Sequence, residues 1–267
     1  MNPNPPIKSQ RSMTALLAGG AILVCASVLG CAADSELKRY DPSLNEIDLR
    51  QGKIADMGVV KFQEPDQIRP PLIATLERTF REERPDLTVL PADSVRHLLG
   101  GERYRKLMLG YEYQGTLDGP ALSEISDSLR GAARFLLLAR VVKDRTRSSA
   151  RGMAQGDTGL SSASYAMGIT GRDAQVVIHL YDLSRRSLAV TARLDGSSEN
   201  SRPVLSPIRP GSSGTVELGR VVPPEETGYP ASPELAQAVE DPFRTFAKTL
   251  PGTPLPAGAP QPVPARR

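Results

Sequence analysis

Apolar residues recur along the middle of the chain with two different spacings. Short apolar runs and strict alternation predict strands in five segments: Ile54 to Phe62, Leu87 to Leu90, Phe135 to Val142, Gln175 to Leu183 and Ser187 to Asp195. Recurrence every three or four residues predicts helices in four others: Pro70 to Arg84, Pro91 to Leu99, Leu122 to Leu129 and Pro233 to Leu250. Proline and glycine mark the boundaries, since proline suits a helix's first turn and glycine commonly ends one.

The order of these segments predicts the fold class. Strands and helices alternate along the chain, and the last two strands form a hairpin around Ser184 to Arg186. This order is typical of an α/β fold in which helices pack on a mixed sheet. We expect a single domain over residues 51–250, closed by the helix that begins at Pro233. Pro242 lies inside that helix and should kink or split it, because proline lacks the N–H that a helix needs.

Four stretches fall outside the expected core because they contain few large apolar side chains. They are a polar tether over residues 31–50, a Gly/Ser-rich loop over 145–172, a Pro-rich segment over 201–228 and a Pro-rich tail over 251–267. Segments of this composition bury too little apolar area to offset the entropy of ordering them. We therefore expect them to be flexible.

The first thirty residues have the layout of a secretory signal peptide. Lys8 and Arg11 precede an apolar run from Ala15 to Leu29, which is shorter than the roughly 20 residues of a transmembrane helix. The run ends in Val28-Leu29-Gly30-Cys31, which resembles the lipobox of bacterial lipoproteins. This resemblance implies cleavage between Gly30 and Cys31 and a diacylglycerol thioether on Cys31. The alternative is an ordinary secretory signal cut nearby, with Cys31 a bystander.

The cysteine count and the charge agree with an exported lipoprotein. The chain has two cysteines, and Cys25 lies inside the segment that would be removed, so the mature protein would have no disulfide. Removing Lys8 and Arg11 lowers the formal net charge from +3 to +1, which excludes the clustered cationic excess of nucleic-acid binding proteins. Ala32 follows the anchor cysteine, and the lipoprotein resemblance then implies the outer membrane, with the domain facing the periplasm.

Two apolar segments of the expected core resemble segments found in a broader group of proteins. They are Gly-Ala-Ala-Arg-Phe-Leu-Leu-Leu-Ala-Arg-Val over residues 131–141 and Val-Ile-His-Leu-Tyr-Asp-Leu-Ser-Arg-Arg-Ser-Leu-Ala-Val over residues 177–190. With the order of elements, they are similar to bacterial lipoproteins that include the curli-secretion lipoprotein and the activators of penicillin-binding proteins. The resemblance covers Ile54 to Leu194 and implies a fold like the amino-terminal domain of the Tol translocation protein. The Gly/Ser-rich and Pro-rich segments depart from it.

Catalytic chemistry finds little support in the sequence. The only histidines, His97 and His179, lie in a predicted helix and a predicted strand, outside any active-site motif. The mature chain contains no His-Glu-x-x-His, Cys-x-x-Cys or Gly-x-Ser-x-Gly motif. We expect no enzymatic activity, no metal and no cofactor, and we expect His179 to make a hydrogen bond on a sheet face.

Tyr104, Tyr111 and Tyr113 form the best candidate for a partner-binding surface, because tyrosine offers a large area with a polar tip. A packing role is the alternative for them. A basic group at Lys143, Arg145, Arg147 and Arg151 suits an acidic partner or anionic lipid headgroups, and the alternative is a solvated strand end.

The sequence thus predicts a non-enzymatic interaction or scaffold module, anchored in the membrane through Cys31. We expect an envelope protein as its partner, in cell-wall synthesis or in a secretion assembly, and an oligomer is compatible with the sequence. The alternative function is a small-molecule-binding lipoprotein that serves an envelope transporter. A cleft with apolar walls and a few polar groups would favour that alternative.

Overall fold

A computed structural model of the chain describes residues 36–63, 69–152, 165–205 and 228–252. The described strands are β1 (Glu36–Tyr40), β2 (Ile54–Lys61), β3 (Val89–Leu90), β4 (Phe135–Gly152), β5 (Tyr165–Asp182) and β6 (Ser187–Leu205). The described helices are α1 (Glu46–Gly52), α2 (Arg69–Glu83), α3 (Ala92–Leu99), α4 (Gly101–Gln114), α5 (Gly119–Ser128) and α7 (Leu235–Thr249).

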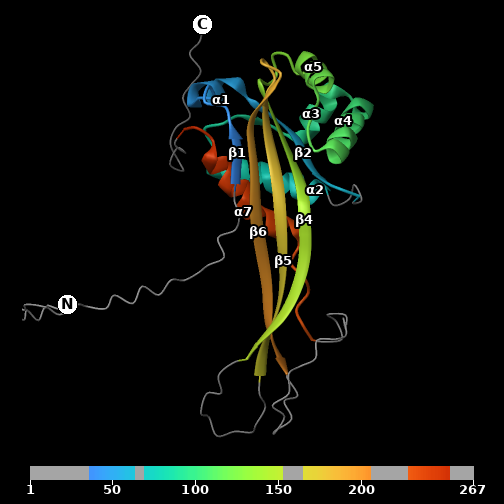
Figure 1. Cartoon of the computed structure of the whole chain (residues 1–267), viewed down its shortest axis with the longest axis vertical. Coiled ribbons are helices and arrows are strands. Elements are labelled where there is room, and N and C mark those ends of the chain that lie inside the picture. The colour runs from blue at the N-terminus through green and yellow to red at the C-terminus, as the bar shows by residue number, and fades with distance from the viewer. Residues whose placement is uncertain (1–35, 64–68, 153–164, 206–227, 253–267) are drawn as a thin grey trace, which may run out of the picture. The chain divides into compact units, whose positions relative to one another are not determined.

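The described strands form one six-stranded mixed sheet in the order β1-β6-β5-β4-β2-β3 (Figure 1). β2 runs parallel to β3 and β4, whereas β4, β5, β6 and β1 pair antiparallel in turn. Helices cover both faces of this sheet. The predicted α/β fold with helices packed on a mixed sheet is therefore confirmed.

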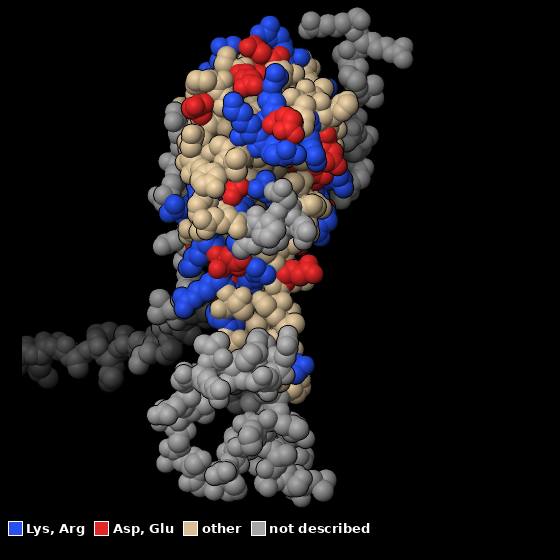
Figure 2. Space-filling model, turned by 90° about the vertical axis from the view of Figure 1, so that its right-hand side faces the viewer, with Lys and Arg blue, Asp and Glu red and all other residues tan. Residues whose placement is uncertain are grey.

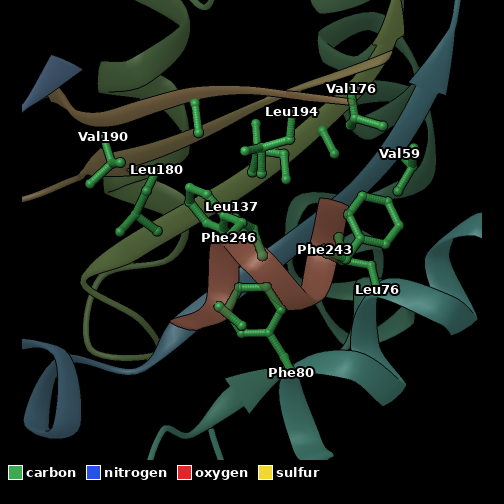
Figure 3. Close-up of a cluster of buried hydrophobic side chains, with 14 of the residues drawn as sticks. Val59, Leu76, Phe80, Leu137, Val176, Leu180, Val190, Leu194, Phe243 and Phe246 are labelled. Carbon is green, nitrogen blue, oxygen red and sulfur yellow. The ribbon is translucent and has the colours of Figure 1, made fainter. Parts of the chain in front are cut away.

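The alternating side chains of the central strands build two separate hydrophobic cores. Leu137, Val176 and Leu180 point to the face that α2 and α7 cover, where Phe80, Phe243 and Phe246 meet them (Figure 3). The opposite face carries Leu136, Leu138 and Tyr181 and is covered by α3, α4 and α5. Buried on both faces, β2 and β4 read as continuous apolar runs, which explains why the sequence identified them.

Helix α7 packs against β6 through its proline. It is one helix from Leu235 to Thr249, so the expected split at Pro242 is wrong. A Cβ placed on Gly196 of β6 would lie 2.2 Å from the carbonyl oxygen of Ala238 and 2.5 Å from Cδ of Pro242. Because Gly196 has no side chain, β6 can approach this turn of α7 closely. In the same turn Pro242 has no N–H to donate to the carbonyl of Ala238.

A buried arginine holds the end of α7 to the rest of the domain. The side chain of Arg84 is fully buried and donates to the carbonyl oxygens of Leu250, at 3.0 Å, and Pro251, at 2.9 Å. Its other donors bind the carboxylate of Asp86, whose pKa is lowered by Arg84 against the effect of burial. The charge is thus paired and hydrogen-bonded, as a buried charge must be.

The segment expected to be a tether over residues 31–50 differs in the structure. Within it, β1 pairs with the outer edge of β6, and α1 begins after Asn45, whose side chain accepts from the N–H of Asp48. Leu49 of α1 is fully buried in the core. The elements are short and bury few side chains, so no periodic apolar pattern announced them.

The loop expected over residues 145–172 is also corrected. β4 continues to Gly152 and β5 begins at Tyr165, so most of this segment is paired strand, and residues 153–164 lie outside the described part. β6 likewise takes residues 201–205 from the expected Pro-rich segment, while 206–227 are not described. We call the three-stranded extension of residues 143–152, 165–174 and 196–205 the ribbon (Figure 1).

Candidate functional site

The three tyrosines of the predicted partner surface lie on one helix but do not share a surface. Tyr104 of α4 donates its hydroxyl to the carbonyl of Met57 at 2.8 Å. Tyr111 is fully buried, and its hydroxyl lies 2.9 Å from Nδ1 of His179, which confirms the predicted hydrogen bond of that histidine. Only Tyr113 is exposed, at 61%. Two residues along a helix turn by about 200°, so Tyr111 and Tyr113 point in opposite directions.

Tyr113 instead belongs to an exposed aromatic pair. Its ring meets that of Phe62 edge-on, with centroids 5.3 Å apart and an interplanar angle of 88°. Lys61 pairs with Val141 at the end of β2, so Phe62, the first residue after β2, and Val142, at the register shift inside β4, each follow one member of this pair. Phe62 is 42% exposed and Val142 41%. We call Phe62, Tyr113 and Val142 the aromatic patch; large exposed apolar side chains in one place are unusual on a protein surface unless they bind something.

Next to the aromatic patch lies a part of the sheet face opposite to the face that α7 covers. Arg140 and Arg193 flank Val177 in one row across β4, β5 and β6. The register of β4 shifts at Val142, so Lys143 and Arg145 point to the same face as Arg140. They lie in the next two cross-strand rows toward the ribbon. We call Arg140, Lys143, Arg145 and Arg193 the basic strip. Lys and Arg side chains gather, with a few acidic ones, where the ribbon leaves the helical part (Figure 2).

The four cations of the basic strip differ from Arg147 in their ionic contacts. None of them forms an ion pair with a residue that the structure describes, and Nε of both Arg140 and Arg193 is buried without a hydrogen bond there. Arg147, one row further out, differs because Asp173 and Glu199 neutralise it. Leaving buried donors without a partner costs free energy. The exposed charges of Lys143 and Arg145 are the ones that an external acceptor can reach.

Asp195 and Asp173 lie on the same face as the strip, in the rows of Lys143 and Arg145, where they bind Gln175 and Arg147. Asp144 points to the other face of the sheet. Asp144 accepts from Arg172 at 2.6 Å and from Lys61 at 2.7 Å, and these contacts hold its pKa below the usual range. Burial, helped by the charge of Arg140, lowers the pKa of His179 to about 4. Asp144 therefore does not offset the strip, and the acidic residues on its own face offset only part of its positive charge.

The other predicted site residues lie elsewhere. Gly30 and Cys31 are outside the described residues, and so is the side chain of Arg151. His97 is exposed on α3. In the part of the chain that the structure covers, no three His, Cys, Asp or Glu side chains cluster as metal ligands would. No helix there is long and apolar enough to span a bilayer.

Sequence reasoning missed Phe62 and Val142 as surface residues. It placed them at the ends of two apolar runs and counted them with the strands. The available signal was that both runs end in a large apolar residue where the polar ribbon begins. That the two ends are neighbours depends on the parallel pairing of β2 with β4, which no local pattern reveals.

Comparisons with known proteins give only distant similarities. No family matches this chain, and no curated protein does. The hypothetical protein CT253 from Chlamydia trachomatis aligns with 55% of this chain and 72% of its own, at 14% identity and a TM-score of 0.32.

Two further structures are similar at the same level. The PelC dodecamer from Paraburkholderia phytofirmans aligns over 65% of this chain and 82% of its own, at 14% identity and a TM-score of 0.29. Lipoprotein GNA1162 from Neisseria meningitidis aligns over 57% and 83%, at 11% identity and a TM-score of 0.28. Scores this low carry no conclusion about function, and the lipoprotein group expected from the sequence stays a prediction.

Proposed function

We propose that this chain is a non-enzymatic docking module of the bacterial cell envelope, anchored in the outer membrane by a lipid on Cys31 and facing the periplasm. It binds an acidic segment of an envelope protein through the aromatic patch and the basic strip. As the sequence resemblance implies, that partner belongs to a cell-wall synthesis or secretion assembly.

The observation that carries the proposal is that exposed aromatic rings adjoin cations that form no ion pair with any residue the structure describes. Tyrosine, phenylalanine and arginine are enriched at the centres of protein interfaces, where they bury large areas at a small entropic cost. Phe62 and Tyr113 already hold each other in an edge-to-face pair, so little freedom is left to lose on binding. The patch is thus preorganised.

The charge pattern favours an acidic protein segment as the partner. Carboxylates would pair with the exposed charges of Lys143 and Arg145, while an apolar side chain of the partner would cover the aromatic patch. The lipid anchor contributes separately, because a tethered domain meets a membrane-bound partner at a raised effective concentration.

Replacing Cys31 by serine is expected to remove the protein from the membrane fraction or to leave the precursor uncut. The reason is that serine cannot form the thioether that the lipobox resemblance implies. Fractionation of cells and mass spectrometry of the mature amino terminus check this result. Cys25→Ser is the matched control and should leave the modified mature protein unchanged. Membrane-bound mature protein carrying an unmodified Cys31 contradicts the anchor.

The docking surface is tested by placing a photo-crosslinking amino acid at position 113 in the membrane-anchored protein. We expect crosslinks to an envelope protein from position 113, because it lies at the centre of the aromatic patch. The same group at Leu98, which is 45% exposed on α3, is the control and should not capture that protein.

Affinity measurements with the captured partner then decide between specific docking and simple proximity. Tyr113→Ala and Arg145→Glu should each weaken binding by about tenfold or more, the range of interface hot spots. Leu98→Ala should leave the affinity unchanged. Added salt should weaken the wild-type complex, because the strip contributes charge. Equal affinities for all variants would show that the patch and the strip do not form the interface.

A further inference from the structure

A cleft of about 350 Å³ lies between α2, α3 and α4, and none of the residues of the aromatic patch lines it. Ile73 and Ala74 of α2 and Met108 of α4 give it an apolar side. Tyr104 also lines it and is fixed by its hydrogen bond to Met57, with a pKa that burial raises to about 12. Small-molecule sites combine apolar walls with a few fixed polar groups in this way.

Charges of both signs line one side of this cleft within one turn of α3. Glu77 of α2 accepts from the N–H of Ala92 at 2.8 Å, which places its carboxylate beside Asp93 at the start of α3. Arg96 follows one turn later. Neither Asp93 nor Arg96 forms an ion pair with another described residue, whereas Arg69 and Arg105, which also line the cleft, bind Glu112 and Glu102.

A third carboxyl group lies buried behind the cleft. Asp56 of β2 accepts from the N–H of Gly58 at 2.7 Å through Oδ1, while its Oδ2 has no partner among the described residues. Gly58 has φ of 102° and packs against the lining side chains, since a Cβ there would lie 3.1 Å from Ile73 and 3.3 Å from the hydroxyl of Tyr104. Glu77 and Asp93 border this end of the cleft, and the buried carboxyl group of Asp56 lies behind them.

We propose that this cleft binds a small zwitterion of the amino-acid class with an apolar side chain. The ammonium group lies toward Glu77 and Asp93, the carboxylate toward Arg96, and the side chain on Ile73 and Met108. Asp93 and Arg96 are three residues apart, so they are separated by about 4.5 Å along the helix axis. An α-amino acid carries its ammonium and carboxylate groups on the same carbon. It can therefore reach Asp93 and Arg96 together, because both lie within one turn of α3.

The test measures binding of leucine to the purified full-length protein by calorimetry. Two probes carry half of its charge each: 3-methylbutylamine has only the ammonium, and 4-methylpentanoate only the carboxylate. We expect leucine to bind with a Kd of about 1 mM or tighter, and each half-molecule to bind at least about tenfold more weakly.

Two variants assign the charges separately. Arg96→Gln should weaken leucine by about tenfold and leave 3-methylbutylamine unchanged, while Asp93→Asn should weaken leucine and leave 4-methylpentanoate unchanged. Arg103→Gln, on α4 but paired with Glu124 outside the cleft, is the matched control and should change nothing.

The proposal is overturned if leucine does not bind, if a half-molecule binds as tightly as leucine, or if Arg96→Gln has no effect. None of these outcomes touches the docking proposal, because the cleft and the aromatic patch share no residue.

Discussion

Replacing Phe246 by alanine is expected to lower the free energy of unfolding by about 3 to 5 kcal/mol, the usual cost of truncating a buried phenylalanine. Phe246 is fully buried on α7, and its ring centroid lies 6.2 Å from that of Phe80 on α2 (Figure 3). The cavity would open between α7, α2 and the sheet, where strands that pair on both sides have little freedom to close it. Equilibrium denaturation in urea measures the change.

Thr245→Ala is the matched control for this experiment, because Thr245 is exposed on the same helix one residue earlier. Its effect should stay within about 0.5 kcal/mol, as at other surface sites. A similarly small effect of Phe246→Ala would mean that α7 does not close the core in solution. Its apolar stripe would then be available to a partner.

The buried strands and the long amphipathic helices were predictable because burial leaves a pattern in the sequence. Phe135 to Val142 is apolar at nearly every position, since helices cover both faces of β4 there. The spacing of Leu72, Leu76 and Phe80 gave α2 to within a residue or two. In each case the same physical cause, exclusion of water from one or both faces, fixed both the residue types and the element.

The outer ribbon was not predictable in this way. Beyond Val142, β4 alternates Lys143, Arg145 and Arg147 with Asp144 and Thr146 and continues into two serines, a composition that predicts a polar loop. There its backbone hydrogen bonds go to β5, and such pairing leaves no apolar signature in a strand whose side chains are mostly exposed. A strand of this kind depends on its neighbours, so only the three-dimensional arrangement shows it.

The candidate site combines both situations. Two of its cations, Lys143 and Arg145, were visible in the sequence as part of a basic group, whereas Arg140 and Arg193 were not. Which of the cations meet acidic partners depends on strand register. Arg147 is neutralised by Asp173 and Glu199 from two other strands, whereas Arg145, two residues earlier, forms no ion pair with a described residue. The prediction that the three tyrosines share one surface was wrong, because α4 was not recognised as a helix. Its apolar pattern is weak and is interrupted by Gly110.

Asp56→Asn is expected to abolish a fall in stability that the wild-type protein shows as the pH rises toward 8. Burial raises the pKa of the Asp56 carboxyl to about 8, and nearby Glu77 adds to this against the hydrogen bond from Gly58. The folded state binds the proton of the Asp56 carboxyl more tightly than the unfolded chain does. The contribution of Asp56 to the free energy of unfolding is therefore largest below pH 4. It is lost as the pH rises through 8.

The full effect of Asp56 is on the order of 5 kcal/mol, from a pKa shift of about 4 units at 1.36 kcal/mol each. Between pH 4 and 6.5 the neutral His179 opposes it, because a lowered histidine pKa makes stability rise with pH in that window. The clean interval is therefore pH 6.5 to 8. There we expect wild-type stability to fall by about 2 kcal/mol.

Urea denaturation at several pH values, run in parallel on wild type and Asp56→Asn, measures the difference directly, since the contribution of His179 cancels. Asparagine keeps an oxygen for the N–H of Gly58 and has no charge to desolvate, so its curve should be flat from pH 6.5 to 8. Asp93→Asn, which removes an exposed carboxylate from α3, should keep the wild-type slope. Parallel curves for wild type and Asp56→Asn would mean that Asp56 is already ionised at pH 6.5 and that water reaches it through the cleft.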